Sequence, residues 1–210
     1  MSNQSIVVFV SSYLDVSLGS KYSIECRREQ TKQTIDSIHT YLPQATIIVG
    51  ELSDLQWDSF PQVNLTHIHL PHKSFYRKNK SLGESYSVLC CIDYITQNNI
   101  PCDLFLKISG RYSLNASFTL DTFTSRDDEP SYYFRPFHDE CFSTVLYALN
   151  GPLFGHFKET LLMPSLLNIN AAVDIEHLFF SYLKKTKNCL HVTNLGVGGN
   201  ISSTEELLIH

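Results

Sequence analysis

The sequence has little that would place the chain in a membrane or a secretory pathway. Its N-terminal apolar run, residues 6–10, is far too short to span a bilayer or to act as a signal peptide. Internal repeats and low-complexity tracts are also absent, which excludes a solenoid or a disordered chain. We expect residues 1–210 to form a single globular domain, alone or as one module of a longer polypeptide.

Cysteines with metal-binding spacing are absent as well. The six cysteines are scattered along the chain, and no Cys-x-x-Cys pair occurs among them. This spacing argues against the common structural zinc sites. We expect reduced, mostly buried thiols, as is usual for a cytoplasmic protein.

Positive charge is scarce. Lys and Arg number 16 against 21 Asp and Glu, so the formal net charge is −5. A general nucleic-acid-binding protein needs clustered Lys and Arg to hold the phosphate backbone, and the composition argues against that class. A local basic pocket remains compatible with this charge.

What the sequence does contain is an alternation of apolar strands and amphipathic helices. Residues 6–12 form an apolar, β-branched run, and residues 25–42 repeat apolar side chains at helical spacing. The other predicted elements are strands at 45–50, 63–70, 104–108, 132–135, 144–149 and 189–192 and helices at 82–97, 156–162 and 171–185. This order predicts an α/β fold with a central mixed, mostly parallel sheet of about six strands, flanked by helices.

The most informative stretch is the predicted strand 104–108 with the turn after it. Ser109 and Gly110 end the strand, and Lys107 and Arg111 flank them. In open α/β sheets, ligands bind outside the carboxyl ends of the strands. A glycine lets backbone amides approach a phosphate, and arginine offers a planar fork of donors. The stretch therefore predicts a phosphate site, although an ordinary strand end with surface cations has the same pattern.

A cation-rich segment precedes the helix at 82–97. Arg77 and Lys80 are expected beside the helix N-terminus, where free amides and cations together attract an anion. A solvated basic loop is the alternative interpretation. Ser81 and Glu84 have the spacing of a capping box.

Two later segments complete the predicted edge. Asp174 and Glu176 begin the last helix, where the helix dipole favours acids, so capping and catalysis are both compatible with them. Residues 196–199, with Gly198 among them, are predicted as a flexible loop that folds over a ligand. We expect these loops to cluster along one edge of the sheet and to form a surface suited to a diphosphate.

The order of these segments resembles small glycosyltransferases of the GT-A fold, and more narrowly the N-terminal domain of a chlorella-virus glycosyltransferase. The likeness spans essentially the whole chain and is carried by residues 6–12, 27–38, 45–50, 80–84 and 105–112. It implies a single GT-A, Rossmann-like domain that moves a hexosyl or deoxyhexosyl group from a UDP-sugar to a hydroxyl of a glycan or glycoprotein acceptor. The resemblance also implies Mn²⁺ or Mg²⁺ assistance and, for a viral enzyme, the host cytoplasm.

The resemblance further implies roles for single residues. Ser11, Ser12 and Tyr13 would hold the base and ribose of the donor, with Arg77 and Lys80 nearby. The rest of the implied site consists of Lys107, Ser109, Gly110, Arg111 and Gly198 for the donor and Asp174 and Glu176 for catalysis. One of the two acids would accept the acceptor's proton in an inverting reaction or stabilise positive charge at the anomeric carbon in a retaining one.

The sequence departs from the family at the metal. Residues 109–111 stand where the family usually has an Asp-x-Asp motif, and no Asp-x-Asp occurs anywhere in the chain. One hypothesis is a metal held chiefly by the diphosphate and water with help from His191, which matches the family's late histidine. The other is that Lys107 and Arg111 replace the metal. His191 is equally compatible with an ordinary strand-end histidine.

Three other functions stay open at this point. The chain could be a non-catalytic nucleotide-binding or nucleotide-sugar-binding module that kept the pocket. It could be a nucleotidyltransferase of related architecture, although two-metal phosphoryl chemistry needs several carboxylates. It could also be a carbohydrate-recognition or scaffold domain, which would have no affinity for nucleotides.

Overall fold

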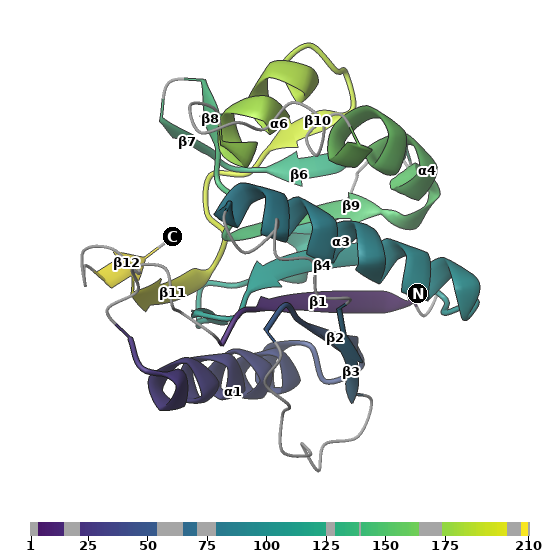
Figure 1. Ribbon diagram of the computed structural model, residues 1–210. Coiled ribbons are helices and arrows are strands. Elements are labelled where there is room, and N and C mark those ends of the chain that lie inside the picture. Colours follow the sequence, from purple (N-terminus) through teal and green to yellow (C-terminus); the bar gives the residue numbers. More distant parts are fainter. Residues whose placement is uncertain are drawn as a thin grey trace.

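The computed structural model describes residues 4–14, 22–53, 65–70, 79–124, 129–138, 140–163, 174–200 and 207–209. Figure 1 shows a central sheet with helices on both faces. Helix α1 (Ile24–Tyr41) covers one face, and α3 (Lys80–Gln97) and α6 (Ile175–Leu183) cover the other. The expected α/β layer arrangement is therefore confirmed.

The central sheet has seven strands in the order β10-β6-β9-β4-β1-β2-β3. Their bounds are β1 Ile6–Ser12, β2 Thr46–Glu51, β3 Leu65–His69, β4 Leu104–Ser109, β6 Tyr132–Phe134, β9 Leu146–Asn150 and β10 Cys189–His191. Strand β9 is antiparallel to both of its neighbours, and every other neighbouring pair is parallel. The sheet is mixed and mostly parallel, as predicted, with one strand more than expected.

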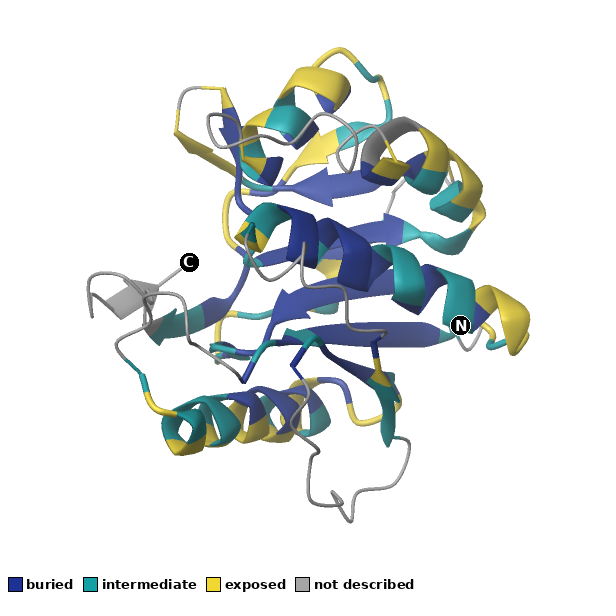
Figure 2. Cartoon of the chain, in the orientation of Figure 1, coloured by how far each residue is buried: buried dark blue, intermediate teal, exposed yellow. Residues whose placement is uncertain are grey.

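Strand β1 shows why the sheet needs helices on both faces. Val8 and Val10 pack into the core beneath α1, whereas Val7 and Phe9 pack into the core beneath α3 and α6. Successive side chains of a strand point to opposite faces, so a continuous apolar run must be buried on both. Figure 2 shows β1 and β4 in the dark blue of buried residues.

A second, smaller sheet lies beside the carboxyl ends of the central strands. Its order is β12-β11-β5, with β5 at Tyr112–Leu114, β11 at Val197–Asn200 and β12 at Leu207–Ile209. The prediction of a flexible glycine loop at 196–199 is thus wrong. A side chain at Gly199 would put its Cβ 2.4 Å from the Arg111 carbonyl oxygen. Glycine is needed here for close strand pairing.

The start of α3 also differs from the sequence interpretation. Asn79 is the N-cap, and its Oδ1 accepts from the backbone N–H groups of Ser81 and Leu82 at 3.0 and 3.2 Å. The capping box predicted for Ser81 and Glu84 is therefore wrong. The carboxylate of Glu84 turns away from the helix end because it contacts the ammonium of Lys107.

The remaining elements lie around the β6 to β10 half of the sheet. Strands β7 (Pro136–His138) and β8 (Cys141–Phe142) form a hairpin that the sequence did not indicate. The predicted helix at 156–162 is α4 (Phe154–Phe157) followed by a π-helical turn at Lys158–Leu162, and short 3-10 turns occupy Leu120–Phe123 and Gly151–Leu153. Residues 171–173 of the predicted last helix lie outside the described residues.

Two general predictions concern thiols and membranes. All six cysteines are free; Cys91 and Cys141 are buried, and the other four are half-buried rather than fully inside. Within the described ranges, no helix has both the length and the apolar character that a bilayer crossing requires.

Candidate functional site

The carboxyl ends of β1 and β4 lie side by side at one edge of the central sheet. Ser11 in β1 is opposite Ser109 in β4. The turn after β4 stays against β1 because the Gly110 N–H donates to the Ser11 carbonyl at 2.9 Å. This edge is on the left of Figure 1, beside β11. Ligands of open α/β sheets bind at such an edge.

The β4–β5 turn is also fixed to α1. The Thr31 hydroxyl is 3.0 Å from the Gly110 carbonyl oxygen and 3.1 Å from the Arg27 carbonyl oxygen, and it can donate to either. A Cβ on Gly110 would lie 2.9 Å from the Thr31 hydroxyl oxygen. The absence of a side chain at Gly110 therefore lets the first turns of α1 approach the turn that carries Arg111.

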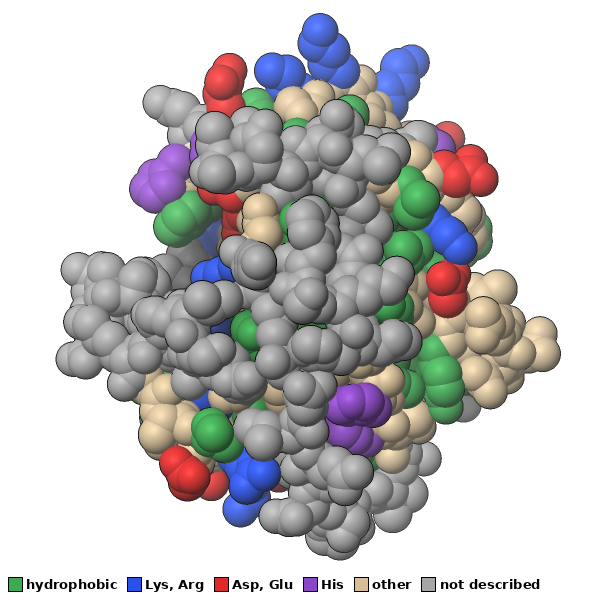
Figure 3. Space-filling model, viewed as in Figure 1, with side chains coloured by type: hydrophobic (Ala, Val, Ile, Leu, Met, Phe, Trp, Pro, Cys, Tyr) green, Lys and Arg blue, Asp and Glu red, His purple; other side chains and the backbone are tan. Residues whose placement is uncertain are grey.

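Cations from three separate segments surround this turn. Arg111 follows Gly110, Arg27 lies near the start of α1, and Lys80 is the first residue of α3. The pKa of Arg27 is lowered to about 10, first by burial and then by the charge of Arg111. The pKa of Lys80 is lowered by the same two causes in the same order. Figure 3 shows blue Lys and Arg side chains along this side of the molecule, between the residues drawn in grey.

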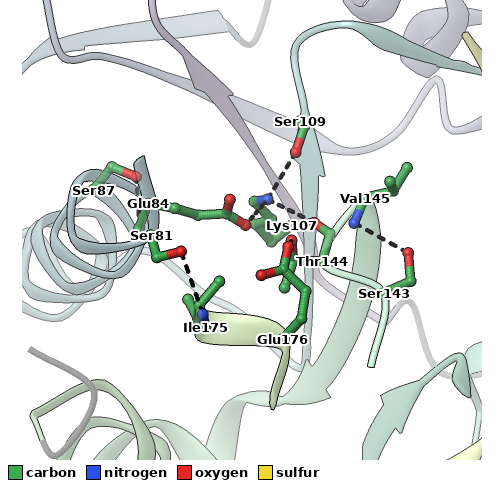
Figure 4. Close-up of polar contacts among 10 residues, drawn as sticks. All are labelled: Ser81, Glu84, Ser87, Lys107, Ser109, Ser143, Thr144, Val145, Ile175 and Glu176. Carbon is green, nitrogen blue, oxygen red and sulfur yellow. Dashed lines mark hydrogen bonds and ion pairs between the residues drawn. The ribbon is translucent and has the colours of Figure 1, made fainter. Parts of the chain in front are cut away.

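Lys107 is a cation of a different kind, because it is completely buried. Its ammonium contacts the Glu84 carboxylate and donates to Ser109 Oγ at 2.9 Å and to the Thr144 carbonyl at 2.7 Å. Figure 4 shows these partners converging on it. All three ammonium donors are used inside the protein, so the expectation that Lys107 offers an open cation beside Gly110 is wrong. Its burial lowers its pKa.

Glu176 joins this network from α6. Its Oε1 accepts a hydrogen bond from Thr144 Oγ1 at 2.8 Å, and the Thr144 carbonyl in turn accepts from Lys107. Burial, followed by the nearby charge of Glu84, raises the pKa of Glu176. Helix α6 is held against α3 at this point because the Ile175 N–H donates to Ser81 Oγ at 3.3 Å. The half-buried Glu176 carboxyl group is thus suited to hold or accept a proton.

Asp174, the other predicted acid, has a structural task. It is the N-cap of α6, where its Oδ1 accepts from the His177 backbone N–H at 3.1 Å and lies 2.6 Å from His177 Nδ1. The Asp174 side chain is about half exposed, and it raises the pKa of His177. Asp174 and Glu176, which the sequence alone does not distinguish, therefore lie in different environments.

The predicted nucleoside contacts lie at the same edge. Ser12 ends β1, and its buried hydroxyl has no hydrogen-bond partner among the described residues. Tyr13 follows it and is half-buried. Gly198 lies in β11 opposite Ser113 of β5, one residue from the Gly199 position that adjoins Arg111. Arg77 lies outside the described residues.

His191 lies apart from this group. It is exposed in β10, and its ring is 5.6 Å from the ring of Phe142. Strands β9 and β6 separate β10 from β4, so the strand that carries His191 is three strand spacings, or about 14 Å, from the strand that carries Ser109. A pocket of about 500 Å³ beside β10 is lined by His191 but by no other predicted site residue.

The residues at the β4 edge do not form a set of divalent-metal ligands. Over the described ranges, no group of three His, Cys, Asp or Glu side chains is placed to hold a metal ion. The groups around Gly110 are cations, and the carboxylates of Glu84, Glu176 and Glu51 already contact Lys107, Thr144 and backbone N–H groups. Hard divalent metals prefer several oxygen ligands, and the described residues here offer no cluster of acidic ligands free of other contacts.

Some residues of this site could not be found from the sequence. In the sequence, Arg27 looks like one residue of the polar face of an amphipathic helix. Only the fold shows that it lies beside the β4–β5 turn. Thr144 belongs to no recognisable motif, and Glu84 has the sequence spacing of a capping residue. Their partners are distant in the chain, as the 79-residue separation of Thr31 and Gly110 illustrates.

Comparisons by sequence add nothing to this geometry, because no protein-family model and no curated protein matches the chain. Comparisons by structure do find similar folds. A glycosyltransferase involved in the glycosylation of the major capsid of PBCV-1 superimposes with a TM-score of 0.54 at 10% identity, over 90% of this chain and 82% of that one.

Two further structures have a similar fold. A putative nucleotide-diphospho-sugar transferase from Desulfovibrio desulfuricans G20 has a TM-score of 0.52 at 9% identity, over 90% of this chain and 79% of that one. A 4-diphosphocytidyl-2C-methyl-D-erythritolsynthase from Anaerococcus prevotii DSM 20548 has a TM-score of 0.54 at 12% identity, over 97% and 90% of the two chains. The strand order and these likenesses show that the chain has a GT-A-like fold.

Proposed function

We propose that this protein is a glycosyltransferase that moves a sugar from a nucleoside-diphosphate donor, UDP-linked in the simplest case, to a hydroxyl of a glycan or glycoprotein. The observation that carries the proposal is the pairing of two features at the end of β4. Cations surround the turn at Gly110, and a half-buried Glu176 with a raised pKa lies close to Lys107 and Lys80. A leaving diphosphate needs cations beside it, and an acceptor hydroxyl needs a group that takes its proton.

The donor would lie across the carboxyl ends of β1 and β4. Its base and ribose would contact Ser11, Ser12 and Tyr13, and Arg111 would offer its guanidinium fork to the phosphate oxygens. The buried hydroxyl of Ser12 supports this placement, because among the described residues it has no hydrogen-bond partner that a ligand group would have to displace. The transferred group would be a hexosyl or deoxyhexosyl residue, as the family resemblance implies.

Glu176 would handle the acceptor's proton. In an inverting reaction the acceptor oxygen bonds to the anomeric carbon, the bond from that carbon to the phosphate oxygen breaks, and its electron pair leaves with the diphosphate. The acceptor's proton then passes to the Glu176 carboxylate. In a retaining reaction the same carboxylate would stabilise positive charge at the anomeric carbon. Thr144 would hold Glu176 in place in either case.

The expected Mn²⁺ or Mg²⁺ remains a prediction from the resemblance, with His191 as its proposed ligand. If bound, such a metal would neutralise charge on the departing diphosphate. The described residues do not supply the ligand set, so none of the steps above depends on a metal.

The proposal is tested by incubating the protein with a panel of UDP-sugars, with and without Mn²⁺, and measuring UDP release and transfer to oligosaccharide acceptors. Glu176→Gln should lower transfer at least about a hundredfold while nucleotide affinity stays within a few fold. Glu159→Gln is the matched control, because Glu159 is exposed. Near-normal turnover by the Glu176 variant would remove the catalytic assignment.

A second candidate function is nucleotidyl transfer. The similarity to the Anaerococcus prevotii synthase, which extends over 97% of this chain, is the observation that favours it. Such an enzyme would consume a nucleoside triphosphate and release pyrophosphate rather than UDP. Binding of UDP without turnover of any donor would instead indicate a nucleotide-binding module.

A further inference from the structure

Arg27 is not one of the donor-site residues implied by the sequence resemblance, yet the fold places it at the β4–β5 turn. Thr31, one helical turn after Arg27, has its hydroxyl within hydrogen-bond distance of both the Arg27 and Gly110 carbonyls, at 3.1 and 3.0 Å. Because Arg111 directly follows Gly110, this contact fixes the backbone of Arg27 close to that of Arg111. Tyr22 lies beneath the Arg27 guanidinium, with its ring centre 6.0 Å from Cζ.

Lys80 is held at the same turn from the opposite side. Glu84, one turn further along α3, contacts Lys107, and Lys107 donates to Ser109 Oγ at 2.9 Å. Ser109 immediately precedes Gly110. Two separate sets of contacts therefore attach the first turns of α1 and of α3 to the end of β4, and each of those first turns carries a cation.

The three cations lie close enough to act on one another electrostatically. Burial and then the charge of Arg111 lower the pKa of both Arg27 and Lys80. Glu51 acts on the pKa of Arg27, and Glu84 and Glu176 act on that of Lys80, in the opposite direction. Like charges held close together repel one another, and a bound anion relieves that repulsion.

We propose that Arg27, Lys80 and Arg111 form a three-cation clamp for the pyrophosphate group of the donor, so that the protein binds this group without a divalent metal. This inference rests on the proposed function for the identity of the donor. The clamp itself needs only an anion with two linked phosphates. Arginine forks bind phosphate oxygens in pairs, and lysine adds a point charge, so the three side chains together can contact both phosphates.

The test is calorimetric titration of the full chain with UDP, UMP and inorganic pyrophosphate, in EDTA and in Mn²⁺. Wild-type protein should bind UDP and pyrophosphate in EDTA, and UMP should bind more weakly than UDP. Arg27→Gln should weaken UDP and pyrophosphate binding at least about tenfold. Lys32→Gln is the matched control, since Lys32 is an exposed cation of the same helix; its affinities should stay within about twofold of wild type.

A folding defect is separated from a binding defect by a second variant. Arg27→Lys keeps the charge but loses the fork, so it should bind pyrophosphate with an affinity between those of wild type and Arg27→Gln. Thermal melts of all variants without ligand show whether the fold is intact. Equal affinity in the Arg27→Gln and Lys32→Gln proteins would overturn the clamp.

The remaining outcomes separate the clamp from the proposed function. UDP binding that occurs only with Mn²⁺ would overturn the clamp and leave the transferase proposal standing. Pyrophosphate binding in EDTA, lost in Arg27→Gln but with no binding of UDP, would support the clamp and contradict the UDP donor. If wild-type protein binds neither compound under either condition, both proposals fail.

Discussion

The ammonium of Lys107 contacts the carboxylate of Glu84 inside the protein, and this ion pair joins the end of β4 to the first turns of α3. The Lys107 side chain has no exposed surface, and the Glu84 side chain is only 14% exposed. Ser109, Thr144 and, through Thr144, Glu176 complete the same network. The pair therefore sets the relative positions of the cation site and the candidate catalytic acid.

Breaking this pair should destabilise the protein strongly. Lys107→Met should lower the free energy of unfolding by about 3 kcal/mol, because a buried carboxylate and the Thr144 carbonyl lose their partner. Glu84→Gln should lower the free energy of unfolding less in the Lys107→Met protein than in wild type. The difference should be at least about 1 kcal/mol. Urea unfolding of the four proteins measures the difference. Strictly additive effects would show that the two side chains do not interact.

Asp174 should matter for α6 and not for transfer. Asp174→Ala should lower the free energy of unfolding by about 1 kcal/mol through loss of the cap, whereas Asp174→Asn should keep most of it. The His177 pKa is raised above its usual 6.5 by the Asp174 hydrogen bond. This pair therefore stabilises the native state below pH 6.5, and the effect is lost as pH rises through the native pKa.

NMR titration of His177 checks this assignment. Its midpoint should be above 6.5 in wild type and should move back toward that value in Asp174→Asn. Loss of sugar transfer in Asp174→Asn, with an unchanged melting temperature, would return Asp174 to the list of catalytic candidates.

Strand β11 should not tolerate a side chain where it adjoins Arg111. Gly199→Ala would place a Cβ 2.4 Å from the Arg111 carbonyl oxygen, so it should cost about 1–3 kcal/mol. Gly155→Ala is the control, because a Cβ there meets nothing within 4 Å and the position is helical. That variant should be neutral or up to about 1 kcal/mol more stable. Equal melting temperatures of the Gly199→Ala and Gly155→Ala proteins would contradict the β5–β11 pairing.

Glu176 should make the stability depend on pH in a defined direction. Its native pKa is raised above 4.5 by burial, so between 4.5 and the native pKa the folded state binds the proton more tightly than the unfolded state. The free energy of unfolding contributed by Glu176 should therefore fall as pH rises through this window. Glu176→Gln has no such group, so wild type should lose stability relative to this variant from acidic to neutral pH in urea titrations. A constant difference would show an unperturbed carboxyl group.

The sequence allowed the central sheet to be predicted because its strands carry a strong local signal. β1 and β4 are apolar runs that end in small residues, and α1 has a clear helical period. β11 carried no such signal. Gly199 is required by the close approach of the Arg111 backbone, which only the folded chain reveals. In the sequence alone, the glycines of this segment resemble those of a flexible loop.

The site was harder to predict because its residues act through distant partners. Glu84 has the spacing of a capping residue, and only the fold shows that Lys107, 23 residues later, takes its carboxylate. Asp174 and Glu176 look equivalent in sequence, although one caps α6 and the other turns toward Thr144. Local spacing placed most of the predicted residues at the carboxyl ends of the strands, but it could not show which contacts each of them makes.

The most direct test of the account is the affinity of Arg111→Ala for UDP, measured by calorimetry beside wild type and the exposed-cation control Lys32→Ala. A nucleoside diphosphate held at the β4–β5 turn requires this half-buried guanidinium, so the affinity should fall at least about tenfold, while Lys32→Ala should bind as wild type does. Equal UDP affinity in all three proteins would contradict a donor site at this edge of the sheet.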